Sequence, residues 1–109
     1  MSFDPNLEGR HEKRLPIVVV VGLAGAERPH GNGEERTYTD NVSPHGARVI
    51  SRHYWQPGEE AQVTPFKYGT LVRGKVVYCR KLANDRFFVG LSFSQRPVHW
   101  STFTYPGVS

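Results

Sequence analysis

The sequence contains one cysteine and one methionine among its 109 residues. Because Cys79 has no second cysteine to pair with, an internal disulfide is excluded, and with it the class of small secreted disulfide scaffolds. A lone thiol is typical of proteins kept in a reducing compartment. The sequence therefore predicts a cytoplasmic location.

A long hydrophobic run is also missing. The most apolar stretch, residues 15–26 (LPIVVVVGLAGA), is too short to cross a bilayer as a helix. It ends in small residues, as a signal peptide does, but the segment before it carries the acidic residues Asp4, Glu8 and Glu12. Its β-branched residues are instead typical of a strand, and we expect no membrane insertion.

The third absence is helical periodicity, because apolar residues nowhere recur at helical spacing over several turns. Glycine (11) and proline (8) are plentiful and separate short segments of β-branched and aromatic residues. These segments predict strands at residues 15–23, 36–40, 47–54, 61–64, 70–80 and 86–93. The sequence thus predicts an all-β fold, a small six-stranded antiparallel barrel.

Three further expectations concern packing. Residues 15–23 are apolar at almost every position, which predicts a central strand buried on both faces. Gly74 lies inside a predicted strand, where glycine is typical of a bend or bulge. Trp55 and Trp100 are expected in the core.

The length allows one domain. The predicted organisation is a flexible arm at residues 1–14, the barrel at residues 15–95 and an irregular tail at residues 96–109.

Residue patterns for catalysis are missing as well. There is no Ser-His-Asp order, no paired carboxylates and no glycine-rich phosphate loop, so no enzymatic activity and no cofactor are expected. The histidines show no zinc-site spacing with one another or with Cys79; they are His11, His30, His45, His53 and His99. The net charge of +4 favours an anionic partner.

Arg10 and Arg14 form the first candidate motif. In an extended segment, residues four apart lie on the same side, so the two guanidinium groups can close around one anion. A guanidinium fork binds phosphate oxygens and also the O6 and N7 atoms of guanine. By spacing alone, a solvated basic arm is the commoner interpretation.

The second candidate motif is the predicted turn at residues 41–46 (NVSPHG). Asn41 and Ser43 offer short polar groups to a ligand edge, and Gly46 permits a close approach to the main chain. Taken alone, this segment is an ordinary turn between two strands.

Together these motifs resemble the PilZ domain family, which has an R-x-x-x-R arm followed by a [D/N]-x-[S/A]-x-x-G turn. Arg10 and Arg14 match the first pattern, and Asn41, Ser43 and Gly46 match the second. Asn41 stands where many members have aspartate; its amide keeps an acceptor oxygen but lacks the negative charge.

A third similarity lies near the end of the chain. Residues 74–78 (GKVVY) and 88–93 (FVGLSF) are similar to the strand pair that closes the PilZ barrel, so the resemblance covers roughly residues 10–95. It implies a split-barrel fold. Tyr78 stands where some relatives carry tryptophan near the ligand.

The resemblance implies binding of cyclic di-GMP, a bacterial second messenger. The two arginines would take phosphates and guanine edges, Asn41 and Ser43 would bond a guanine, and Gly46 would leave room for the ligand. Tyr78 and His45 are further candidates for ligand contact. The signal would pass by conformational change to an effector protein that the sequence does not identify.

Two other functions stay open. A basic barrel with many aromatic rings could bind single-stranded nucleic acid by stacking and charge, although that function leaves the paired motifs without a purpose. Alternatively, a PilZ-like domain could be a protein-interaction scaffold without a ligand, and the missing charge at Asn41 keeps that reading open.

Overall fold

The computed structural model describes residues 13–25, 34–65, 71–94 and 97–100. These ranges contain six strands: β1 (Val20–Gly25), β2 (Glu35–Ser43), β3 (Gly46–Ser51), β4 (Glu60–Pro65), β5 (Val72–Lys81) and β6 (Phe87–Ser92). Most of the predicted arm and most of the predicted tail lie outside the described residues. In the described ranges, no helix is long and apolar enough to span a membrane.

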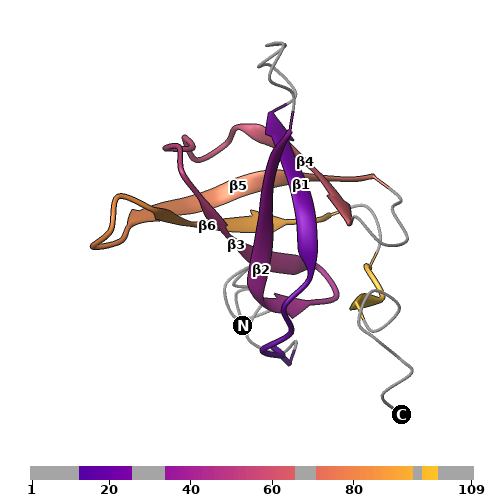
Figure 1. Ribbon diagram of the computed structural model, residues 1–109. Helices are drawn as coiled ribbons and strands as arrows, with labels where there is room; N and C mark the ends of the chain where they lie inside the picture. Colours follow the sequence, from indigo (N-terminus) through magenta and orange to yellow (C-terminus); the bar gives the residue numbers. More distant parts are fainter. Residues whose placement is uncertain (1–12, 26–33, 66–70, 95–96, 101–109) are drawn as a thin grey trace, which may run out of the picture.

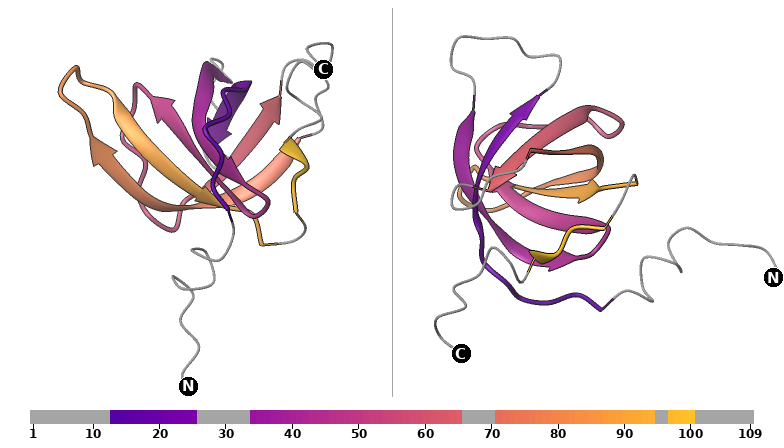
Figure 2. Two further views of the ribbon diagram at one scale, coloured as in Figure 1. Left: turned by 90° about the horizontal axis from the view of Figure 1, so that it is seen from below. Right: turned by 90° about the vertical axis from the view of Figure 1, so that its right-hand side faces the viewer.

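The six strands form a closed barrel in the order β1-β2-β3-β6-β5-β4, with β4 pairing back onto β1 (Figure 1 and Figure 2). Every neighbouring pair is antiparallel. Closure pairs the two edges that an open sheet would leave exposed. The predicted all-β barrel is confirmed.

The core consists of inward-facing residues that meet in register. Matched positions on β2, β3, β6 and β5 hold four apolar residues that are at most 3% exposed: Val42, Ala47, Leu91 and Val76. Burying an aliphatic side chain of the size of valine or leucine contributes about 1.5–3 kcal/mol. Trp55 and Trp100 are 2% and 4% exposed, so their predicted place in the core is confirmed.

The first predicted strand, residues 15–23, is buried on one face only. Val19 and Val21 are buried, whereas Val18 is 63% exposed and Val20 is 45% exposed. The prediction of burial on both faces is wrong. A barrel wall is one sheet thick, so alternate side chains of a strand point outward.

The segment that precedes β1 runs beside β2 and is held there by hydrogen bonds. Leu15 pairs with Val42 through two of them, Leu15 N to Val42 O at 2.8 Å and Val42 N to Leu15 O at 2.9 Å. The buried hydroxyl of Thr39 donates to the carbonyl of Ile17 at 2.8 Å and accepts from Val19 N at 2.9 Å. The Thr39 side chain thus adds two hydrogen bonds to the backbone pairing of the segment before β1.

The predicted turn at residues 41–46 is shorter than expected. Asn41 and Ser43 belong to β2, which pairs with β3 as far as Ser43 and Gly46, and only Pro44 and His45 form the turn. The strand continues because a register shift between Thr39 and Asn41 accommodates one extra residue.

The bulge expected at Gly74 lies elsewhere in β5. Gly74 pairs regularly with Ala61, and the register shift falls between Val76 and Tyr78. A Cβ atom on Gly74 would lie 2.6 Å from a ring carbon of Phe93, so glycine is needed there for close packing.

Replacing Thr39 by valine tests the attachment of the segment before β1. The isosteric change leaves the Val19 N–H and the Ile17 carbonyl without the hydroxyl, and we expect a loss of about 2 kcal/mol or more in the free energy of unfolding in urea. Thr64→Val on β4, where the side chain is only half-buried, is the control, with an expected change below about 0.5 kcal/mol. Equal losses in the two variants would contradict this role of Thr39.

Candidate functional site

A row of outward-facing positions crosses four strands beside the buried row of the core. Asn41 of β2 pairs with Arg48 of β3, Arg48 pairs with Gly90 of β6, and Gly90 pairs with Tyr78 of β5. Side chains alternate between the two faces of a strand, so the neighbours of buried residues point outward. This outer face, built on β2, β3, β6 and β5, carries the candidate site.

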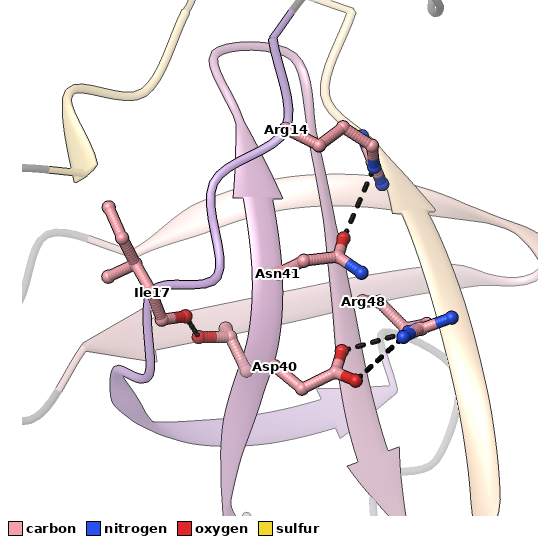
Figure 3. A network of polar contacts seen from close by, with 6 residues as sticks. Arg14, Ile17, Asp40, Asn41 and Arg48 are labelled. Atoms are coloured by element: carbon pink, nitrogen blue, oxygen red, sulfur yellow. Dashed lines mark hydrogen bonds and ion pairs between the residues drawn. The ribbon is translucent and has the colours of Figure 1, made fainter.

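Arg14 lies over the β2 end of this face. The pairing of Leu15 with Val42 sets its position. Its guanidinium donates from Nε to Asn41 Oδ1 at 3.2 Å (Figure 3) and from Nη1 to Ser43 Oγ at 3.0 Å. Three residues of the two sequence motifs therefore meet, although Arg14 is separated from Ser43 by 29 positions in the chain.

Gly46 completes this group at the start of β3. A Cβ atom there would lie 3.3 Å from Ser43 Oγ, 3.4 Å from Arg14 Nη1 and 3.1 Å from the carbonyl oxygen of Leu91. A larger residue would press on the Arg14–Ser43 contact. Glycine keeps that contact unstrained.

Arg48 is a charged group of this face that the sequence motifs do not include. Its guanidinium forms two parallel bonds with Asp40, Nε to Oδ1 at 2.9 Å and Nη2 to Oδ2 at 2.8 Å (Figure 3). The guanidinium carbon also lies 4.0 Å from the centre of the Phe88 ring. The Asp40 carboxylate raises the pKa of Arg48, burial opposes this increase, and Tyr78 adds to it. Asp40 therefore compensates the charge of Arg48.

Arg14 differs from Arg48 in the charge of its partners. Among the described residues, the oxygens that it contacts belong to the Asn41 amide and the Ser43 hydroxyl, both neutral. Arg48, by contrast, contacts the carboxylate of Asp40, so the two arginines differ in the charge of the groups that hold them.

Two register shifts shape this face from opposite sides. The shift in β2 makes Asp40 an extra residue, and the shift in β5 does the same for Val77, which is 54% exposed. Bulges redirect side chains, and here one of them directs the Asp40 carboxylate toward Arg48.

Tyr78 lies at the far end of the row. Its ring occupies the space above Gly90, where any Cβ atom would overlap it, and the guanidinium carbon of Arg80 lies 5.8 Å from the ring centre. His45 is exposed in the β2–β3 turn. Arg10 lies outside the described residues.

Metal binding has no support in the described part of the chain, where no group of three or more His, Cys, Asp or Glu residues comes together. The Cys79 sulfur accepts a hydrogen bond from the backbone N–H of Trp55 at 3.3 Å.

Comparison with protein families matches the PilZ domain over residues 8–99, so the chain belongs to the PilZ family. The known role of this family is binding of cyclic di-GMP in signalling. Comparison with curated proteins found no match.

The barrel is similar to the solved structure of the Bacillus subtilis inhibitor of motility (MotI/DgrA), with a TM-score of 0.61 and 19% sequence identity. The similarity covers 80% of this chain and 43% of that protein, so this chain spans less than half of its length. At this identity the likeness shows the shared fold.

A double-mutant cycle tests the pairing of Asp40 with Arg48. With Asp40→Asn and Arg48→Gln, urea unfolding is expected to give a coupling energy of about 1 kcal/mol, because the pair is bidentate and its side chains are only 28% and 25% exposed. The exposed pair Lys81–Asp85, at 3.7 Å, is the control and is expected to give less than about 0.3 kcal/mol. A coupling near zero for Asp40–Arg48 would show that the pair does not stabilise the fold.

Proposed function

We propose that this chain binds cyclic di-GMP on the outer face of β2, β3, β6 and β5 and passes the signal to a partner protein. The observation that supports this most directly is the position of Arg14, whose charged guanidinium lies on the neutral oxygens of Asn41 and Ser43. Membership of the PilZ family supports cyclic di-GMP as the ligand.

Arg14 would bind a phosphate of the ligand. Its Nε and Nη1 atoms already contact the protein, which orients the guanidinium plane and leaves its remaining N–H groups for phosphate or guanine oxygens. Arg10, on the N-terminal arm, would bind the ligand beside Arg14. An anchored guanidinium loses less conformational freedom on binding than a solvated one.

Asn41 and Ser43 would recognise a guanine edge. The Asn41 carbonyl oxygen accepts from Arg14, and its amide N–H groups can donate to guanine O6 or N7. Gly46 would let the ligand approach the turn. His45, which precedes Gly46, is a further candidate for ligand contact. Tyr78, whose ring lies against Gly90, would stack on a base.

Replacing Arg14 by alanine is the decisive test. By titration calorimetry, wild type is expected to bind cyclic di-GMP, and Arg14→Ala is expected to bind about 100-fold more weakly, because it loses a charge-assisted bond. Arg73→Ala is the matched control: it removes the same charge from an exposed position of β5 that pairs with Gln62 of β4, and its affinity should stay within about twofold of wild type.

Equal weakening in both arginine variants would indicate non-specific attraction. An oligonucleotide that binds more tightly than cyclic di-GMP, with steep salt dependence, would instead support a nucleic-acid function. A folded wild type that gives no heat beyond dilution would reject the receptor function.

Replacing Asn41 by aspartate tests the departure from the commoner motif. A carboxylate would accept the N1–H and N2–H of guanine with charge assistance, so we expect about tenfold tighter binding in the same titration. Weaker binding would mean that neutralising the charge of Arg14 outweighs the gain at the guanine. Binding by Asn41→Asp but not by wild type would support a scaffold without a ligand.

A further inference from the structure

Three consecutive carbonyl groups, one at the end of β2 and two in the β2–β3 turn, accept hydrogen bonds from one later part of the chain. The acceptors are the carbonyl oxygens of Ser43, Pro44 and His45. Their donors, in the same order, are Trp100 Nε1 at 2.6 Å, Val98 N at 2.7 Å and Phe93 N at 2.9 Å. The chain after β6 therefore holds the backbone of the whole turn (Figure 2).

Trp100 is the most distant of these donors in sequence and is anchored by burial. It is 4% exposed, and the centre of its ring lies 6.0 Å from the centre of the ring of Phe93, which is 1% exposed. Val98 is buried as well, while His99 between them is exposed. A buried indole N–H needs an acceptor, so the position of the ring and the position of the Ser43 carbonyl depend on each other.

Ser43 is consequently held at two points. Its carbonyl accepts from Trp100 on the core side, and its hydroxyl accepts from Arg14 on the outer face. Rotation of the Ser43 backbone would move the hydroxyl away from the guanidinium. Fixing the carbonyl therefore fixes the group that orients Arg14.

We propose that Trp100 is a positioning residue for the ligand site and that the packing of residues 97–100 is coupled to ligand binding at this site. The proposal rests on the proposed binding of cyclic di-GMP. A coupling free energy acts equally in both directions. A ligand that binds Arg14 and Ser43 therefore also stabilises the packing of residues 97–100 against the β2–β3 turn. Ligand binding can thus alter the surface that residues 97–100 present to a partner protein.

Trp100→Phe tests this role, because it removes the indole N–H and keeps a buried ring. Trp55→Phe is the matched control. Trp55 is equally buried and donates from Nε1 to Ser51 Oγ at 3.0 Å, at the opposite end of β3 from Gly46. Both variants are expected to lose stability in urea, but only Trp100→Phe is expected to bind cyclic di-GMP about tenfold more weakly in calorimetry.

Unchanged affinity in Trp100→Phe would overturn the proposal. Equal weakening in both tryptophan variants would also overturn it, because the effect would then follow from general destabilisation. If Trp100→Phe is unfolded in buffer, all three proteins are titrated in trimethylamine N-oxide, which favours folded states, and the same outcomes decide.

A readout without ligand separates this proposal from the proposed function. The backbone amide resonances of Ser43, His45 and Gly46 are expected to shift in Trp100→Phe and to stay in place in Trp55→Phe. This result together with no binding of cyclic di-GMP by wild type would reject the receptor function and retain Trp100 as the residue that positions the turn. Unshifted amides in Trp100→Phe would overturn the positioning role whether or not the ligand binds.

Discussion

The pairing of Leu15 with Val42 is the interaction on which the candidate site depends. Two backbone hydrogen bonds hold the segment before β1 against β2, and Thr39 extends this attachment through its hydroxyl. Because backbone bonds fix the direction of the chain, the residue before Leu15 can only project over the end of β2. Arg14 meets Asn41 for that reason.

Charge on the outer face is divided between two arginines with different partners. Asp40 neutralises Arg48 and, with Phe88 beneath the guanidinium, makes it part of the barrel wall. Arg14 contacts only neutral oxygens among the described residues. An anion would therefore be drawn to Arg14 rather than to Arg48, since a compensated charge attracts little.

The β2–β3 turn connects this outer face with the core. The hydroxyl of Ser43, just before the turn, accepts from Arg14, and the carbonyl groups of Ser43, Pro44 and His45 are held by the chain after β6. A two-residue turn with a proline has few alternative conformations, so a displacement of its backbone on the core side also displaces the groups on the outer face. A binding site on such a turn is linked to a distant segment without any large movement of the barrel.

The sequence by itself determined the all-β class, the approximate strands, the core positions of both tryptophans and the residues of the two motifs. The alternation of apolar with polar residues and the positions of turn-forming residues are local signals, which can be taken directly from a short sequence. Only the tertiary structure decided that Asp40 is an extra residue in β2, that Arg48 pairs with it, and that Trp100 reaches Ser43. These features depend on register and on contacts between residues far apart in the chain, which alternation does not encode.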